Sequence, residues 1–92
     1  MPRLFKIGSY VIYFRVNENQ PVEPVRVHVS EGHQTENATK IWLSSTGKCK
    51  LCHNNSKIPS RHLYNIMRLI DNNSKYIIEM WKKYFGEVKF YC

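Results

Sequence analysis

The chain carries at residues 25–30 the stretch VRVHVS, in which three valines alternate with Arg26, His28 and Ser30. Successive side chains of a β-strand point to opposite faces of a sheet, so this alternation predicts a strand with one apolar and one polar face. The valines are expected to face a core, and Arg26 and His28 to lie about 7 Å apart on the other face.

Further strands are predicted on both sides of this stretch. Residues 4–7 and 10–16 are rich in β-branched and aromatic side chains and are separated by Gly8. Residues 17–24 carry turn-forming residues, and strands are again predicted at 38–43 and 48–53, joined by a turn at 44–47. Four or five antiparallel strands therefore precede any helix.

A helical pattern follows the strands. It is predicted to begin at Pro59-Ser60 with Ser60 as the N-cap, to carry apolar residues at helical spacing, and to end at Gly86. Residues 71–74, DNNS, are poor helix formers, so either one helix of about 25 residues bends there or two shorter helices meet. The uninterrupted apolar spacing favours one helix. Residues 88–91 are a candidate last strand, and the predicted fold is α+β, with the helices packed on one face of the sheet.

Length and composition restrict the class of protein. A chain of 92 residues with 42% hydrophobic residues fits a single packed domain over residues 1–92. No run of about 18 apolar residues and no signal-peptide pattern is present, so we expect a cytoplasmic protein that does not enter a membrane. The net charge of +7 favours polyanionic partners such as nucleic acid or an acidic protein surface.

The positive charge is concentrated in one stretch. No acidic residue lies between Glu36 and Asp71, whereas six basic residues do: Lys40, Lys48, Lys50, Lys57, Arg61 and Arg68. In addition, Arg61, Arg68, Lys75 and Lys82 recur every seven residues, which predicts a basic stripe along a helix. A charged helix face is often only a solvated face, and residue pairs such as Asp71 and Lys75 fit that interpretation. Both interpretations stay open here.

The polar face of the 25–30 strand is a second candidate site. Arg offers a planar fork for phosphate or carboxylate, and a histidine beside a permanent cation tends to stay neutral. A solvated sheet face is the simpler interpretation. His53 and Asn54 are candidate partners of His28, and an alternative hypothesis is a metal-independent nuclease in which His28 and His53 act as acid and base, with Arg26 or Lys40 stabilising the phosphate.

The motif at residues 49–53, CKLCH, matches the spacing of covalent haem attachment and of half a zinc site. Haem attachment requires an exported chain, and a zinc site requires a second pair of ligands. Residues three apart in a strand also point to opposite faces, so Cys49 and Cys52 are not expected to share a ligand. We therefore expect free thiols, no metal and no cofactor.

The segments 1–14, 27–32, 37–43, 53–59 and 85–92 resemble a family of short bacterial proteins, the domain-of-unknown-function family four-one-six-zero. The resemblance implies membership of a two-gene, toxin-antitoxin-like module with a small partner protein from the adjacent gene. Relatives usually carry His-x-His where this chain has Arg26-Val27-His28, so of that pair only His28 carries over. His53 and Asn54 also match.

The sequence thus predicts a small basic binding protein, without enzymatic activity, that contacts a partner protein, nucleic acid, or both. Self-association is compatible with this hypothesis. The predicted binding residues are Arg26, His28, Lys40, Lys48, Lys50, His53, Asn54, Lys57, Arg61 and Arg68.

Overall fold

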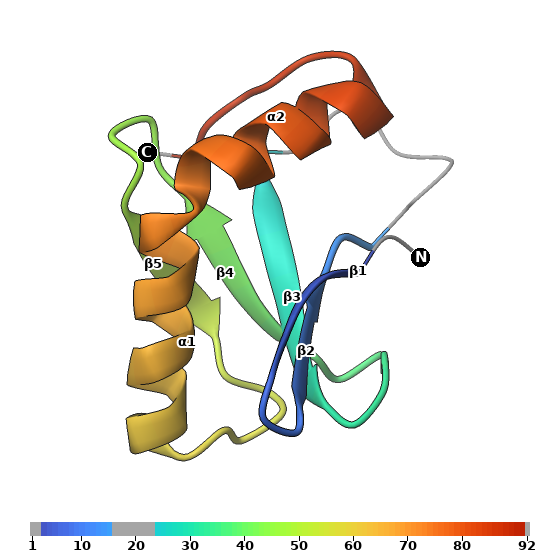
Figure 1. The fold of residues 1–92 in the computed structure, drawn as a ribbon, viewed down its shortest axis with the longest axis vertical. Helices are drawn as coiled ribbons and strands as arrows, with labels where there is room; N and C mark the ends of the chain where they lie inside the picture. Colours follow the sequence, from blue (N-terminus) through green and yellow to red (C-terminus); the bar gives the residue numbers. More distant parts are fainter. Residues whose placement is uncertain (1–2, 16–23, 92) are drawn as a thin grey trace.

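A computed structural model describes residues 3–15 and 24–91 of the chain. Its five strands are β1 (Arg3–Ile7), β2 (Tyr10–Tyr13), β3 (Arg26–Glu31), β4 (Thr39–Leu43) and β5 (Cys49–His53). They form one antiparallel sheet in the order β1-β2-β3-β4-β5, and two helices follow, α1 (Ser60–Asn72) and α2 (Ser74–Phe85) (Figure 1). The predicted α+β class is confirmed. Residue 16 of the second predicted strand, and residues 17–23 of the predicted turn, lie outside the described residues.

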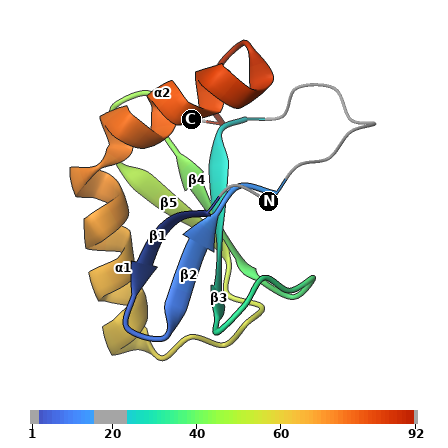
Figure 2. The same ribbon diagram turned by 45° about the vertical axis from the view of Figure 1, so that its right-hand side comes forward.

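Apolar side chains from alternate strand positions meet the helices in one core. Both helices pack on the same face of the sheet, as predicted: α1 runs along the side of β5 and α2 crosses one end of the strands (Figure 2). The edge of the Phe14 ring meets the indole of Trp81 with centroids 5.3 Å apart. The fully buried side chains are Ile12, Phe14, Val25, Val27, Val29, Ile41, Leu43, Ile66, Ile70, Ile77 and Trp81, together with Tyr13 on the opposite face.

The helical region consists of two helices, so the preference for one bent helix was wrong. Asn73, with φ −119° and ψ 18°, lies between them in a conformation outside the helical range. Its side-chain Nδ2 donates to Leu69 O at 2.8 Å, a local bond with which Asn competes against the regular helix. The apolar spacing continues across the break because both helices face the same core. The break also divides the predicted basic stripe, since Arg61 and Arg68 lie on α1, and Lys75 and Lys82 on α2.

The start of α1 differs from the prediction, whereas the end of α2 agrees with it. Pro59 is the N-cap of α1 and Ser60 is its first helical residue, so the predicted Ser60 cap was wrong. The fixed φ of proline suits the observed φ of −55°. At the other end, Gly86 has the left-handed φ of 83° and donates its backbone N–H to Lys82 O, which confirms the predicted end of α2. Neither described helix is long and apolar enough to cross a membrane.

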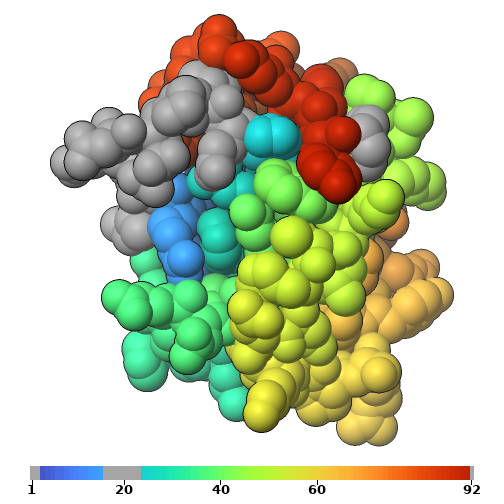
Figure 3. All heavy atoms as spheres, turned by 180° about the vertical axis from the view of Figure 1, so that it is seen from behind, coloured from blue at the N-terminus to red at the C-terminus, as the bar shows by residue number. Residues whose placement is uncertain are grey.

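The chain after α2 returns to the face of the sheet that the helices leave uncovered (Figure 3). Val25 N donates to Lys89 O at 2.9 Å, and the Tyr91 ring stacks on Trp42. Residues 88–91 do not form the predicted strand, because this one backbone hydrogen bond is not continued into a ladder among the described residues.

Candidate functional site

Cross-strand pairing brings polar residues from four strands into line on the helix-free face. One row runs from Tyr13 through His28 and Lys40 to His53. The next row contains Arg26, Trp42 and Lys50. Paired residues of neighbouring antiparallel strands share a face, so both rows lie opposite the core. Seen from behind, the helices appear only at the rim of this face (Figure 3).

A β-bulge places His53 in its row. Ile41 pairs with Leu51 but Lys40 pairs with His53, so Cys52 is an extra residue in β5. In an unbroken ladder Cys52 would stand opposite Lys40, and His53 would point to the other face. The bulge therefore aligns His53 with Lys40 and His28.

We call the cationic and imidazole side chains of this surface the basic sheet face: Arg15, Arg26, His28, Lys40, Lys50 and His53. His28 lies at its centre and is only 5% exposed. Burial first, and then the charges of Arg15, Arg26, Lys40 and His53, lower the pKa of His28 from 6.5 to about 3. The imidazole is therefore neutral at physiological pH and sits in a strongly positive environment.

The neutral imidazole also has unused hydrogen-bonding capacity. Its Nδ1 is buried and has no hydrogen-bond partner within the part of the chain that the structure describes. Buried polar atoms usually have a partner, so an unpaired one at the centre of a cationic surface is unusual. The stacking of the ring beside Tyr13, with centroids 6.0 Å apart, fixes its orientation.

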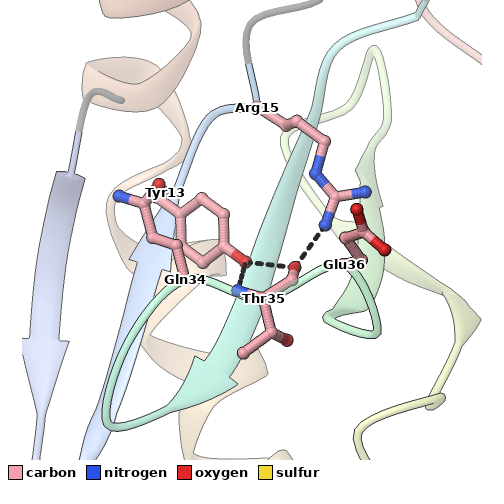
Figure 4. A pocket seen from close by; sticks show the side chains of 5 residues that line it. All are labelled: Tyr13, Arg15, Gln34, Thr35 and Glu36. Atoms are coloured by element: carbon pink, nitrogen blue, oxygen red, sulfur yellow. Dashed lines mark hydrogen bonds between the residues drawn. The ribbon is translucent and has the colours of Figure 1, made fainter.

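Arg15 reaches this face beside an open hollow of about 370 Å³ (Figure 4). Its guanidinium donates to Thr35 O, and the Tyr13 hydroxyl donates to the same oxygen at 3.2 Å while it accepts from Thr35 N at 3.2 Å. These bonds hold the β3–β4 loop against β2 and fix the arginine. Glu36 also lines the hollow, so its carboxylate opposes anion binding at this end.

Two aromatic rings form a stack at the other end of the face, which we call the aromatic pair: Trp42 and Tyr91. Their centroids are 4.9 Å apart and their planes differ by 6°. Lys40 Nζ lies 4.4 Å from the centroid of the Trp42 ring, and Lys50 Nζ lies 5.9 Å from that of Tyr91. Cations at these distances are attracted by the ring faces. The surface thus combines flat apolar rings with positive charge.

Of the predicted binding residues, Arg26, His28, Lys40, Lys50 and His53 come together, but Asn54 does not join them as a ligand-binding group. Its Oδ1 accepts from Thr39 Oγ1 at 2.7 Å and from Ile58 N at 3.0 Å, and its Nδ2 donates to Ile58 O at 2.9 Å. Asn54 therefore shapes the loop between β5 and α1. Lys57 lies in the same loop with a φ of 57°.

The remaining predicted binding residues also lie away from the basic sheet face. Arg61 and Arg68 are exposed on α1, which packs on the opposite face of the sheet, and the Arg68 guanidinium lies 5.8 Å from the Tyr64 ring centroid. Lys48 is exposed just before β5. The basic stretch of the sequence is thus distributed over two sides of the molecule.

The two cysteines of the CKLCH motif have different environments. Cys49 faces the helices, where its Sγ donates to Met67 O at 3.4 Å and its backbone N–H donates to Asp71 Oδ1 at 2.7 Å. Burial, and then the Asp71 carboxylate, raise the pKa of its thiol to about 12. Cys52 is exposed in the bulge. Among residues 3–15 and 24–91, no three His, Cys, Asp or Glu side chains converge to hold a metal ion.

Four residues of the site were not among the predicted binding residues: Tyr13, Arg15, Trp42 and Tyr91. Alternation in the predicted strand at 10–16 could have found the first two, because the fully buried core residue Phe14 lies between them. No local pattern predicts Tyr91, since its position depends on the path of the chain after α2.

These features define a small α+β protein whose sheet has one apolar, helix-covered face and one helix-free face that carries Lys40, Lys50 and His53 around the buried residues Arg26 and His28. The chain belongs to the family described as domain of unknown function DUF4160, whose sequence profile matches residues 9–82. This match confirms the family resemblance and includes every residue of the basic sheet face. Neither a curated protein nor a solved structure matches the chain.

Proposed function

We propose that this protein binds nucleic acid through the basic sheet face. The observation that carries the proposal is the placement of Arg15, Arg26, Lys40 and His53 around the buried, neutral His28. The accessible cations of this face, Arg15, Lys40 and Lys50, attract a phosphate backbone, and binding releases the counterions of the nucleic acid. The net charge of +7 adds long-range attraction to the same class of ligand.

The geometry favours binding over cleavage. His28 and His53 lie on β3 and β5 with Lys40 of β4 between them, so their backbones are about 10 Å apart at the usual strand spacing. Acid-base cleavage needs one protonated and one neutral histidine at the reacting phosphate. With a pKa of about 3, His28 cannot supply a proton near neutral pH and is a weak base. The nuclease hypothesis therefore has less support.

We further propose that the protein acts in a two-gene, toxin-antitoxin-like module in the cytoplasm, with a small partner protein. Membership of the DUF4160 family is the support for this part, through the module arrangement that the resemblance implies. Co-expression with the product of the adjacent gene, followed by size-exclusion chromatography, tests it. A stable complex is expected, and separate elution of the two proteins would count against the partner.

The test of nucleic-acid binding is a salt titration with a labelled oligonucleotide. Log affinity should fall linearly with log salt concentration, and neutralising one phosphate-contacting lysine should reduce the slope by about 1. Lys40→Gln is the test variant. Arg61→Gln is the matched control, since it removes one charge from the same stretch of sequence but from the helix on the other side.

Two outcomes would contradict the proposal. The first is the absence of binding at low salt. The second is an equal loss of affinity in the two variants, because it would assign the effect to net charge and not to the basic sheet face. An NMR titration of His28 provides an independent measurement: a bound phosphate backbone offsets the surrounding positive charge, so the pKa of His28 should rise from about 3 on binding.

A further inference from the structure

The C-terminal segment brings an aromatic ring to the basic sheet face. The chain reverses at Gly86, whose φ is 83°, and is fixed to β3 by the hydrogen bond from Val25 N to Lys89 O. Two residues later, the Tyr91 ring lies parallel to Trp42. This contact joins residues 49 positions apart in the sequence, and Tyr91 lies outside the span matched by the family profile, residues 9–82.

The stacked tyrosine keeps a large accessible surface. Tyr91 is 58% exposed although Trp42 lies against one of its faces, and Trp42 itself is half-buried. A planar ring that stacks on a second ring and keeps more than half of its surface exposed offers an area on which a nucleobase can stack. Lys50 Nζ lies near the Tyr91 ring and Lys40 Nζ near the Trp42 ring, so both ammonium groups are placed to attract the phosphates next to such a base.

We propose that the aromatic pair is a base-stacking subsite that makes the protein selective for single-stranded nucleic acid. This inference rests on the proposed function and specifies its ligand class. In a duplex both faces of each internal base are covered by neighbouring bases, so they are closed to a protein ring, whereas a base of a single strand can stack on Tyr91. Lys40 and Lys50 hold the adjacent phosphates, and the rest of the basic sheet face follows the backbone.

A purely structural role of Tyr91, as an anchor of the C-terminal segment, predicts different behaviour. If Tyr91 only anchors the segment, it stabilises the fold and does not contact the bases of a ligand. The affinity for a single strand then depends on its phosphates and is the same with and without bases. A stacking subsite responds to the bases themselves. The two roles are therefore separated by removing bases from the ligand while its charge is kept.

The experiment compares two single-stranded oligonucleotides of equal length and charge, one with normal bases and one with abasic sites along its centre. The wild-type protein should bind the base-bearing strand at least about fivefold more tightly. Tyr91→Leu should reduce this ratio to near one, and Tyr91→Phe should keep it. Tyr64→Leu is the control, because Tyr64 is 62% exposed on α1, away from the basic sheet face.

The results separate this inference from the proposed function. Equal, salt-dependent affinity of the wild-type protein for both strands would overturn the stacking subsite and leave nucleic-acid binding intact. Loss of the ratio in Tyr64→Leu, or its retention in Tyr91→Leu, would also overturn it. A failure to bind either strand would reject both proposals. A duplex of the same length should bind more weakly than the base-bearing strand, and thermal unfolding of Tyr91→Leu verifies that the variant is folded.

Discussion

The two faces of the sheet are built from the same strands and differ in what covers them. On β4, Ile41 is fully buried under the helices, whereas its neighbour Lys40 points to the opposite face between His28 and His53. On β3, Val27 and Val29 face the core while His28 faces away from it, and the guanidinium of the buried Arg26 lies 5.4 Å from the ring centroid of the core residue Trp81. The helix-covered face holds the larger apolar core, whereas the other face, which no helix covers, combines a small buried cluster with charged side chains.

The largest expected effect is on the helix-covered face. Ile41→Ala removes buried methyl groups and leaves a cavity, which should lower the free energy of unfolding by about 2–5 kcal/mol. Urea denaturation followed by circular dichroism measures this loss. A loss below about 1 kcal/mol would mean that the core collapses around the site, and the contrast between the faces would be weaker than we describe.

The buried imidazole of the helix-free face should make the stability of the protein sensitive to acid. The pKa of His28 is 6.5 in its ordinary state and about 3 in the folded protein, so the unfolded chain binds the proton first. The contribution of His28 to stability is fully present above pH 6.5 and is lost as the pH falls toward 3, by roughly 2–3 kcal/mol at pH 4. Unfolding titrations of the wild type and His28→Phe between pH 7 and 4 measure the difference.

The His28→Phe variant is the control. The pH dependence of its unfolding free energy comes from the other titrating groups, chiefly the carboxylates, and is subtracted from that of the wild type. Parallel pH profiles of the two proteins would show that His28 is not the group responsible.

A smaller effect is expected from the polar contacts of the helix-free face. Tyr13→Phe removes the hydroxyl that bonds the backbone of Thr35, which should cost about 1 kcal/mol of folding free energy. It should also loosen the loop that positions Arg15. Tyr84→Phe, on the exposed surface of α2, is the control and should change stability little. Equal effects of the two substitutions would argue against a defined hydrogen-bond network at this loop.

The smallest effect on stability is expected for Lys40→Gln. Lys40 precedes Ile41 in β4 and points to the opposite face of the sheet. Its side chain is only half-buried and lies outside the core, so the free energy of unfolding should change by no more than about 0.5 kcal/mol. Its removal should nevertheless raise the pKa of His28, because the Lys40 charge contributes to lowering it. NMR titration of the imidazole measures this shift, and an unchanged pKa would show that the two side chains are not electrostatically coupled.

Much of the fold could be predicted because its signals are local. Alternation in residues 25–30 predicted both the strand and its two faces, and Gly86 marked the end of α2. The start of α1 was misjudged at Ser60, where no side-chain bond caps the helix. The choice at Asn73 also failed, because apolar spacing reports which side faces a core and is the same for one helix as for two that share that core.

The sequence by itself determined the strands of the sheet and their apolar and polar sides. It also determined the pair of candidate site residues Arg26 and His28, which lie two positions apart, since all of these depend on the period of two along a strand. Only the tertiary structure decided which basic residues act together. Pairing between strands joined Lys40, Lys50 and His53 to them, the bulge at Cys52 turned His53 to that face, and the helices carried Arg61 and Arg68 to the other side. The returning chain then placed Tyr91 on Trp42. Such contacts depend on register and chain path, which no local sequence pattern encodes.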